Sequence, residues 1–167
     1  HTFRSLHARI YSNLSQFQDD DLQTVLCPLS THFGHGLIGI CLTTLVGGGH
    51  LVLFDGKPLQ LSARFGDLID SHEVTFLSSV PSLWHLILKF SHPPKNTSLK
   101  KIYVGSAPLG KKLWRQIIQW SQGCEVTNVY GITETANWIG GASSAHSEPC
   151  DGLVGKVWSG DAAILNE

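Results

Sequence analysis

The sequence predicts an α/β fold in which a mostly parallel sheet carries helices on both faces. Two observations lead to this fold class. Between about residue 50 and residue 130, short apolar runs of strand length alternate with longer stretches of helical pattern. Most of the short runs are apolar at successive positions, which is typical of parallel strands that are covered on both sides. Such an alternation places consecutive strands in parallel and makes each connection a helix.

The N-terminal part begins with an amphipathic helix that we expect to run from Phe3 to about Leu22. Its apolar residues recur at intervals of three or four: Leu6, Ile10, Leu14 and Phe17. Three consecutive aspartates, Asp19–Asp21, then predict a polar turn before a short apolar run at Thr24–Leu26. The residues from Gly36 to Val46 are apolar on almost every side, which predicts a buried helix that stops at Gly47–Gly49.

The central and C-terminal parts continue the alternation. Leu51–Phe54 is an apolar run followed by Asp-Gly, as in a strand that is buried on both faces. We expect the remaining helices at 61–71, 81–90 and 109–120, and the remaining strands at 74–77, 102–104 and 126–130. Pro81 suits the first turn of its helix, because an N–H is not needed there. Leu153–Leu165 alternates more loosely, so we expect a C-terminal hairpin outside the sheet.

The overall composition narrows the class of protein. A formal net charge of −1 gives no electrostatic reason to expect a nucleic-acid partner. No apolar run approaches the ~20 residues that a membrane-spanning helix needs. The four cysteines are scattered without a CxxC pair, which argues against a zinc or disulfide framework and favours a cytoplasmic location. The chain has no methionine and begins at a histidine, so we expect it to be an excerpt of a longer protein.

One loop of small residues follows the strand expected at 102–104. In a parallel sheet, ligands bind at the carboxyl ends of the strands, where this loop lies. It consists of Gly105, Ser106, Ala107 and Pro108. Small side chains let the backbone approach a flat ligand closely, and the proline fixes the entry into the next helix. The same residues also suit an ordinary strand-to-helix turn, so the loop alone does not decide between the two.

A second loop, Asn128–Thr135, follows the next strand and combines an aromatic ring, a hydroxyl and a carboxylate. Tyr130 could stack on a base, Thr133 could bind a phosphate oxygen, and Glu134 could ligate Mg²⁺, which prefers oxygen ligands. An alternative interpretation is a helix start, with Thr133 as the N-cap and Glu134 as an exposed acid in the first turn. Residue types alone leave both interpretations open.

Six segments in the same order resemble the adenylate-forming superfamily of acyl-CoA synthetases, peptide-synthetase adenylation domains and luciferases. Tyr130–Glu134 matches its Tyr-Gly-x-Thr-Glu motif, and Gly105–Leu109 matches its Gly-Gly/Ser-Ala-Pro-Leu turn. The other four segments are His1–Leu6, Pro28–Leu37, Val80–Trp84 and Gly152–Lys156. The resemblance implies a Rossmann-like subdomain of that fold, with 1–150 as the nucleotide- and acid-binding subdomain and 151–167 as the start of a truncated β segment.

The resemblance also implies an activity: a carboxylate attacks the α-phosphate of ATP, giving an acyl adenylate and pyrophosphate, and a thiol of CoA or of a carrier protein then usually takes the acyl group. Thr133 and Glu134 would be the catalytic residues, with Glu134 holding Mg²⁺. The residues implied to bind ATP or AMP are Gly105, Ser106, Ala107, Pro108, Asn128, Tyr130 and Gly131. Gly131 would also leave room for the acid to reach the phosphate.

The acid pocket is implied to contain His32, Phe33 and Trp138, with Phe33 at its gate and Gly140–Gly141 nearby, although Trp138 suits core packing equally well. Amino-acid-activating members usually carry an aspartate beside the phenylalanine, and no acid is near Phe33. Since burying an ammonium without a partner is costly, we expect a fatty, aryl or other plain carboxylic acid. His32 and His35 form an HxxH pair, but no third ligand lies close in sequence, so zinc is not favoured.

Three parts of the family pattern fall outside this sequence: the phosphate loop with its lysine, the ribose-binding Thr-Gly-Asp segment, and the small C-terminal domain with the adenylation lysine. We therefore expect the isolated chain to be inactive. Two alternatives stay open: a non-catalytic nucleotide-binding or scaffolding module, and an amino-acid-adenylating module of a peptide synthetase. A dehydrogenase is excluded, because no GxGxxG follows any strand.

Overall fold

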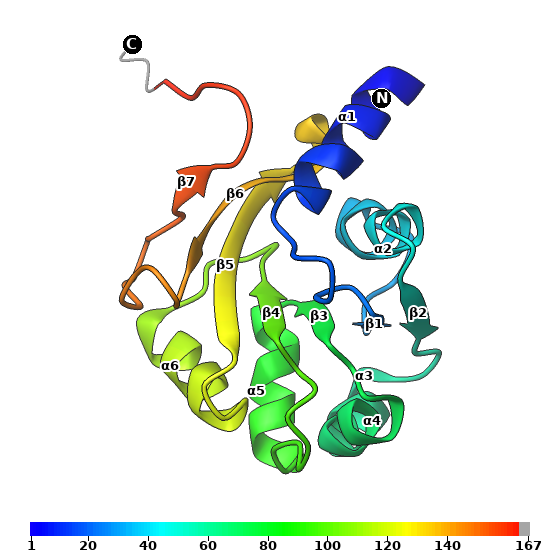
Figure 1. The fold of residues 1–167 in the computed structure, drawn as a ribbon. Coiled ribbons are helices and arrows are strands. Elements are labelled where there is room, and N and C mark those ends of the chain that lie inside the picture. Colours follow the sequence, from blue (N-terminus) through cyan, green and yellow to red (C-terminus); the bar gives the residue numbers. More distant parts are fainter. Residues whose placement is uncertain (164–167) are drawn as a thin grey trace.

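The computed structural model describes residues 1–163 of the chain and contains one seven-stranded sheet (Figure 1). The strand order is β2-β1-β3-β4-β5-β6-β7. The strands are β1 (Thr24–Cys27), β2 (His50–Leu53), β3 (Phe76–Ser79), β4 (Lys101–Val104), β5 (Glu125–Ile132), β6 (Asn137–Ser143) and β7 (Lys156–Val157). Strands β1 to β5 are parallel to one another, whereas β6 and β7 are antiparallel to their neighbours. The predicted α/β fold with a mostly parallel sheet is confirmed.

Helices cover both faces of the sheet, as predicted. They are α1 (Phe3–Leu14), the π-helix η1 (His35–Leu42), α2 (Thr43–Val46), α3 (Pro58–Ala63), α4 (Phe65–His72), α5 (Pro81–Phe90), α6 (Lys111–Trp120) and the 3-10 helix η2 (Thr133–Thr135). Helices α3 to α6 lie on one face of the sheet, and α1, η1 and α2 lie on the other (Figure 1). Among the described residues, no helix has the length and apolar character needed to cross a bilayer.

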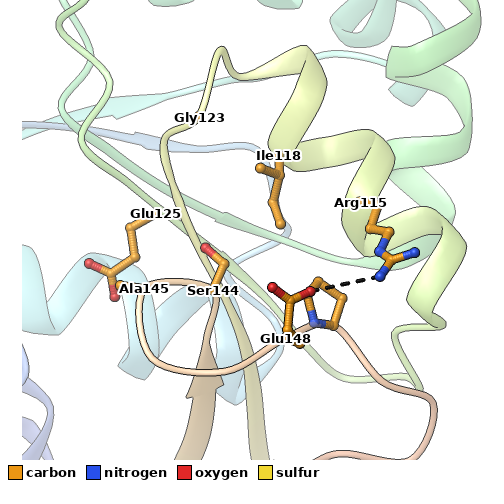
Figure 2. A pocket seen from close by; sticks show the side chains of 8 residues that line it. Arg115, Ile118, Gly123, Glu125, Ser144, Ala145 and Glu148 are labelled. Carbon is orange, nitrogen blue, oxygen red and sulfur yellow. Dashed lines mark ion pairs between the residues drawn. The ribbon is translucent and has the colours of Figure 1, made fainter.

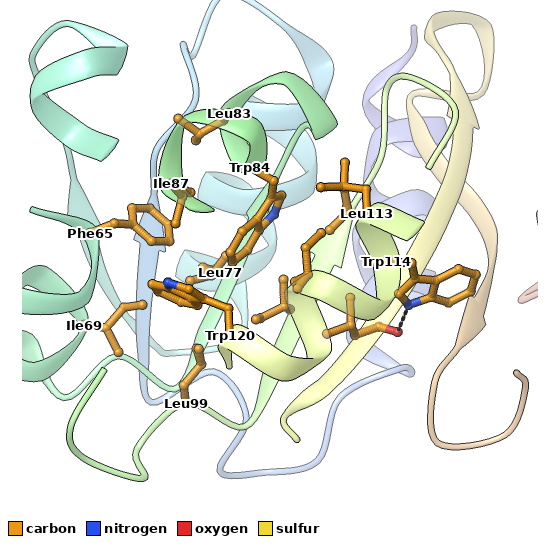
Figure 3. Packing of buried hydrophobic residues seen from close by; sticks show 14 of the residues in the cluster. Phe65, Ile69, Leu77, Leu83, Trp84, Ile87, Leu99, Leu113, Trp114 and Trp120 are labelled. Atoms are coloured by element: carbon orange, nitrogen blue, oxygen red, sulfur yellow. Dashed lines mark hydrogen bonds between the residues drawn. The ribbon is translucent and has the colours of Figure 1, made fainter. Parts of the chain in front are cut away.

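The larger core lies under α3 to α6 and is built around aromatic side chains (Figure 3). Trp84 packs edge-on against Phe65 and Trp120, with ring centroids 5.8 and 5.4 Å apart. Trp114 is also fully buried, and its indole N–H donates to the Val126 carbonyl at 3.1 Å. Large buried rings of this kind dominate the free energy of burial, so this face anchors strands β3, β4 and β5.

The N-terminal helix is shorter than predicted, because α1 ends at Leu14 rather than near Leu22. The chain turns there, and the carboxylate of Asp21 accepts a hydrogen bond from the backbone N–H of Gln18 at 2.9 Å. Because of this turn, Phe17 lies outside the helix and packs against Phe76 and Tyr103 on the sheet. Tertiary packing therefore overrides the helical spacing of Phe17.

Two predicted helices are also interrupted or altered. The helix expected at 61–71 is split into α3 and α4 at Arg64, whose φ of −115° and ψ of 13° are not helical. The helix expected at 36–46 is mostly a π-helix, and it passes into a regular helix at Thr43. π-helical turns are rare and frequently occur at functional sites.

The edges of the sheet differ most from the prediction. Within residues 1–163, strand β2 pairs only with β1, and Leu53 is 58% exposed, so the prediction of a strand buried on both faces is wrong. Strand β6 was not predicted. The expected C-terminal strand is present as β7, but β7 pairs with β6 within the main sheet rather than outside it. Residues 164–167 of the expected hairpin lie outside the described part of the chain, and the boundary at 150 stays a prediction.

Candidate functional site

The two loops predicted to bind the nucleotide follow strands β4 and β5, which are neighbours in the sheet. Val104 at the end of β4 is in register with Asn128 of β5. Ser106 and Tyr130 each follow two residues later, and both are exposed. Neighbouring strands lie about 4.8 Å apart, so the loop 105–108 and the ring of Tyr130 share one edge of the sheet. The structure brings together these two predicted parts of the nucleotide site.

The backbone of the first loop approaches β5 so closely that only glycine fits at position 105. A Cβ atom at Gly105 would lie 2.6 Å from Cγ2 and 2.8 Å from the carbonyl oxygen of Val129. Ser106 then adopts a φ of +65°, a left-handed conformation that is uncommon for a residue with a side chain. A conformation of this kind persists only where its surroundings hold it, and such residues concentrate at ligand sites.

A buried histidine forms a hydrogen bond with the side chain of Ser106. His35, at the start of η1, is 7% exposed, and its Nδ1 lies 2.7 Å from Oγ of Ser106. Its Nε2 lies 2.7 Å from Oγ of Ser78 on β3. The ring also packs edge-on against Trp138, with centroids 5.4 Å apart. Burial lowers the pKa of His35 to about 4, so the ring is neutral at physiological pH.

Sequence reasoning considered His35 only as one half of an HxxH metal pair. In the structure both of its ring nitrogens are engaged with hydroxyl groups, and His32 is exposed. Among the described residues, no group of three or more metal-ligating side chains comes together. The role of His35 could not be read from the chain, because its two partners lie 43 and 71 residues away.

The second loop does not begin a helix. Strand β5 continues to Ile132, and Thr133–Thr135 forms a single 3-10 turn that ends at Ala136 in a left-handed conformation. Strand β6 follows at once. The interpretation of Thr133 as a helix N-cap is therefore wrong. The side chains of Thr133 and Glu134 are exposed at this turn, and within residues 1–163 the Glu134 carboxylate forms no ion pair.

Glycine is required at position 131 by the close approach of strand β6, which could not be read from the sequence. A Cβ atom there would lie 2.3 Å from the carbonyl oxygen of Asn137 in the paired strand β6. The space beside Gly131 is thus filled by the protein itself, which corrects the expectation that Gly131 leaves room for the acid. The register of the two strands shifts at this point, between Tyr130 and Gly131. Glycine often marks such bulges.

The N-terminal helix holds the turn in place. A ring nitrogen of His1 donates to the Thr133 carbonyl at 2.7 Å, and Nε of Arg9 donates to the Thr135 carbonyl at 3.0 Å. A cavity of about 290 Å³ lies here, lined by His1, Ser5, Ala8, Arg9, Glu134, Thr135, Ala136 and Ser159. Glu134 thus borders a hollow that Arg9 also lines. Arg9 could not be predicted as a support of this turn from the sequence, because its contact is with a backbone carbonyl.

The residues predicted for the acid pocket differ in their exposure to solvent, and the pocket stays a prediction. Phe33 is 70% exposed, His32 is exposed, and Trp138 is 2% exposed within the apolar cluster under η1. Trp138 packs against His35 and Tyr103, which supports its packing role. Asn128 is buried, and its side-chain amide donates to the Leu153 carbonyl at 2.7 Å. Asn128 therefore ties β5 to the segment before β7, and its part in nucleotide binding stays a prediction.

Gly140 and Gly141 were expected to lie near the acid pocket, but both pack against neighbouring strands of the sheet. A Cβ atom on Gly140 would lie 2.4 Å from the Lys156 carbonyl oxygen of β7, and one on Gly141 would lie 2.9 Å from the side chains of Thr127 and Trp158. Both glycines therefore serve the close approach of neighbouring strands, not an open pocket.

A larger hollow of about 400 Å³ lies beside α6, at the opposite end of β5 (Figure 2). It is lined by Arg115, Ile118, Gly123, Glu125, Ser144, Ala145, Glu148 and Pro149. Arg115 and Glu148 form an ion pair across it at 3.7 Å, and the side chain of Glu148 is 92% exposed. None of the predicted site residues lines this hollow. Ligands of parallel sheets bind at the carboxyl ends of the strands, so the edge with Ser106 and Tyr130 is the better candidate.

The residues at this edge fit a nucleotide and a hard cation. Tyr130 offers a half-exposed ring beside a backbone that approaches closely through Gly105. Mg²⁺ commonly takes one or two carboxylates together with phosphate oxygens of the substrate. Glu134 can supply one such carboxylate, and the hydroxyl of Thr133 lies next to it in the chain. A carboxylate and a hydroxyl are oxygen ligands of the kind that such a cation takes.

Comparison with known proteins gives a consistent result. A family described as AMP-binding enzyme matches residues 1–167. A dimodular nonribosomal peptide synthase of Bacillus subtilis (strain 168) is 26% identical over 125 residues, which are 73% of this chain and 5% of that protein. The 4-coumarate–CoA ligase-like 4 protein of Oryza sativa subsp. japonica is 26% identical over 150 residues, which are 88% of this chain and 26% of that protein. The chain thus spans about a quarter or less of these relatives.

Solved structures show the same fold. The adenylation domain AlmE of Vibrio cholerae, in complex with glycyl-adenosine-5'-phosphate, superimposes with a TM-score of 0.80 at 22% identity, covering 95% of this chain and 30% of that one. O-succinylbenzoate coenzyme A synthetase of Bacillus subtilis, in complex with ATP and magnesium ion, gives a TM-score of 0.74 at 23% identity, covering 93% of this chain and 31% of that one.

Proposed function

Because the chain belongs to the family of AMP-binding enzymes, we propose that the protein takes part in an AMP-forming ligase reaction. A carboxylic acid is activated with ATP as an acyl adenylate, and the acyl group then passes to a thiol of CoA or of a carrier protein. One observation carries the proposal. The exposed ring of Tyr130, the close backbone at Gly105 and the Thr133–Glu134 turn share the carboxyl edge of β4 and β5.

Each residue at this edge has a proposed part in the reaction. The base lies against Tyr130, with the backbone of 105–108 on its other side. The hydroxyl of Thr133 donates to an oxygen of the α-phosphate, and the carboxylate of Glu134 is a ligand for Mg²⁺. Mg²⁺ supplies positive charge that stabilises the pyrophosphate as it leaves. Arg9 supports the turn through the Thr135 carbonyl, and Asn128 supports β5 through Leu153.

The proposed substrate is a fatty, aryl or other plain carboxylic acid. The sequence contains no aspartate or glutamate between Asp21 and Asp55, the stretch that includes Phe33 and η1. A substrate ammonium on this side of the site would have no local carboxylate, and leaving a charge unpaired in a buried site is unfavourable. We also propose a cytoplasmic location, because the four cysteines are scattered in the sequence without a CxxC pair.

A second candidate is the activation of an amino acid in a peptide synthetase. The similarity to the dimodular peptide synthase of Bacillus subtilis favours it. It differs from the first candidate in the acid alone, because adenylate formation is common to both. A non-catalytic nucleotide-binding module differs from both in lacking the exchange reaction.

ATP–pyrophosphate exchange tests the proposal, with the protein expressed from its complete coding sequence and a panel of fatty, aryl and amino acids. We expect Mg²⁺-dependent exchange with at least one plain acid. The Glu134→Gln variant should lower the exchange rate by about 10²-fold, the usual effect of removing one group that stabilises transition-state charge. Exchange with amino acids only would support the second candidate. Nucleotide binding without any exchange would support a non-catalytic module.

A further inference from the structure

Two buried thiols lie close together where strand β1 packs against η1. Sγ of Cys27, the last residue of β1, lies 3.9 Å from Sγ of Cys41 in η1. The thiol of Cys27 also donates to the Leu29 carbonyl at 3.4 Å. The two residues are 1% and 5% exposed, and both cysteines are free. They are 14 positions apart in the chain, so the pair is not visible as a CxxC motif.

The chemistry of the pair is that of a dithiol. Within the described part of the chain, no set of three or more metal-ligating side chains comes together, so the two thiols have no third ligand beside them. An S–S bond is about 2.05 Å long. The sulfur atoms, now 3.9 Å apart, therefore have to approach one another by about 1.9 Å, which is 3.9 minus 2.05. Rotation of the two side chains and a small shift of η1 are sufficient for such a movement.

We propose that Cys27 and Cys41 form a reversible redox pair, in which a disulfide links η1 to β1 when the protein meets a peroxide. Disulfides in cytosolic proteins are usually transient or redox-sensing rather than structural, which agrees with a free pair at this distance. The link closes the segment between the two cysteines, which carries Phe33 and His35. The inference is independent of the proposed function, because it concerns only the thiols and the helix that one of them belongs to.

The oxidation has two steps, with hydrogen peroxide as the oxidant. The sulfur of Cys41, the more exposed of the two, loses its proton and attacks one oxygen of the peroxide. The O–O bond breaks, which leaves a sulfenic acid on Cys41 and releases one water. The sulfur of Cys27 then attacks the sulfur of Cys41, the S–O bond breaks, and the hydroxyl leaves with the proton of Cys27 as a second water. The two sulfur atoms together lose two electrons, and the peroxide gains them.

Packing protects the pair as long as η1 stays in place. Burial raises the pKa of Cys27 to about 12 and also raises the pKa of Cys41. Little thiolate therefore forms near neutral pH, and the thiolate is the reactive species. Oxidation requires a local opening of η1, and the composition of η1 favours opening: it contains two glycines, its N-terminus has no side-chain cap, and π-helical turns are rare. The disulfide then prevents further opening.

Mass spectrometry of the oxidised protein tests the proposal. The protein is expressed from its complete coding sequence, treated with hydrogen peroxide, unfolded in N-ethylmaleimide to block free thiols, and digested. No lysine or arginine lies between positions 9 and 57, so trypsin alone leaves both cysteines in one peptide. Chymotrypsin, which cuts after Phe33, separates them. We expect Cys27 and Cys41 in two peptides joined by a disulfide, which dithiothreitol releases.

The variants and the contradicting outcomes are specific to this pair. In Cys41→Ser, Cys27 should stay unlinked and react with N-ethylmaleimide. Cys150→Ser, at an exposed thiol, is the matched control and should keep the link. If both Cys27 and Cys41 carry N-ethylmaleimide in a sample whose Cys150 is oxidised, the inference is overturned, and separate sulfinic acids on the two residues would overturn it as well. This result comes from the unmodified protein and does not depend on the folding of a variant.

Hydrogen–deuterium exchange measures the effect of the disulfide on η1. The backbone amides of residues 35–42 should exchange about tenfold more slowly, or slower still, after oxidation, because the link suppresses local opening. Dithiothreitol should restore the faster exchange, and Cys41→Ser should exchange equally with and without peroxide. The amides of α6, on the other face of the sheet (Figure 1), are the internal control and should not change. Equal exchange of residues 35–42 in the oxidised and reduced proteins would contradict the proposed link.

Discussion

Gly105 and Ser106 show how few atoms shape the proposed base slot. Gly105 is needed because Val129 occupies the space of a side chain, and Ser106 is held by His35 from below. Both constraints come from β5 and η1 rather than from the loop itself. The slot is therefore prepared by the packing of the sheet, and changes of single atoms at these two residues should be measurable.

Replacing Gly105 with alanine should destabilise the fold. The added methyl group would meet Val129 Cγ2 at 2.6 Å and its backbone oxygen at 2.8 Å, and overpacking of this kind typically costs about 1–3 kcal/mol. Urea denaturation measures the change in the free energy of unfolding. Gly34→Ala is the control, since the nearest atom would lie at 3.9 Å and the φ of Gly34 is −55°. Equal stability of the Gly105→Ala and unmodified proteins would contradict the close approach.

His35 should make the stability depend on pH in a defined window. Burial lowers its pKa from 6.5 to about 4, so the unfolded chain binds a proton at a higher pH than the native protein does. The stabilising contribution is complete above pH 6.5 and is lost as the pH falls toward 4; it amounts to roughly 3 kcal/mol. We expect the loss of stability between about pH 7 and about pH 5 to be smaller in His35→Gln. The same pH dependence in both proteins would show that His35 is not buried as described.

At this scale the candidate site residues could be predicted from the sequence, but the residues that support them could not. Tyr130, Thr133 and Glu134 were predicted from a local motif, and the structure exposes them at one edge. His35, Ser78 and Arg9 were not predicted as a support, because each acts through a partner far along the chain. Phe33 and Trp138 were predicted to share a pocket, yet one is exposed and the other is in the core. Short motifs report local chemistry, whereas side-chain direction depends on the assembled fold.

Among the elements, the central and the edge strands look alike in sequence but differ in burial. Leu51–Phe54 and Phe76–Leu77 both read as apolar, and only the latter is buried. The order of strands in the sheet decides this, and the order is not encoded in any single run. Strand β6 was missed for a related reason: its glycines suit a loop, and their use as close contacts appears only when β5 and β7 lie beside it.

This difference between strands predicts unequal effects of leucine truncation. Leu77 of β3 is fully buried, and Leu77→Ala should cost about 2–5 kcal/mol of unfolding free energy. Leu53 of the edge strand β2 is 58% exposed, and Leu53→Ala should cost less than about 1 kcal/mol. Thermal or urea unfolding of the two variants measures both values. Similar losses would show that β2 is covered by further protein, which would change the description of this edge.

On the scale of the whole molecule, the carboxyl and the amino ends of the parallel strands have different roles. The carboxyl ends of β4 and β5 carry the candidate site, whereas the amino ends carry a partly buried ion-pair cluster. There Nζ of Lys101 lies 2.9 Å from Asp21 and 3.6 Å from Glu125, and it also approaches the ring of Phe17. Lys101 and Asp21 are 9% and 5% exposed, so each depends on the other for neutralisation.

Removing the charge of Lys101 should therefore destabilise the protein. Lys101→Met leaves the carboxylate of Asp21 buried with little compensation, and breaking such a pair costs about 3–5 kcal/mol. Lys100 provides the control: it pairs with Asp20 in solvent, and Lys100→Met should leave the unfolding midpoint unchanged. A double variant with Asp21→Asn should recover part of the loss. No recovery would show that packing of the lysine stem, not its charge, is responsible.

Photo-crosslinking with 8-azido-ATP tests most directly whether the nucleotide site lies at the carboxyl edge of β4 and β5. The protein is expressed from its complete coding sequence, labelled with and without excess ATP, digested, and analysed by mass spectrometry. We predict ATP-protected labelling of the peptides that contain Tyr130 and residues 105–108. Protected labelling in the hollow between Arg115 and Glu148 instead, or no protected labelling at all, would contradict the account.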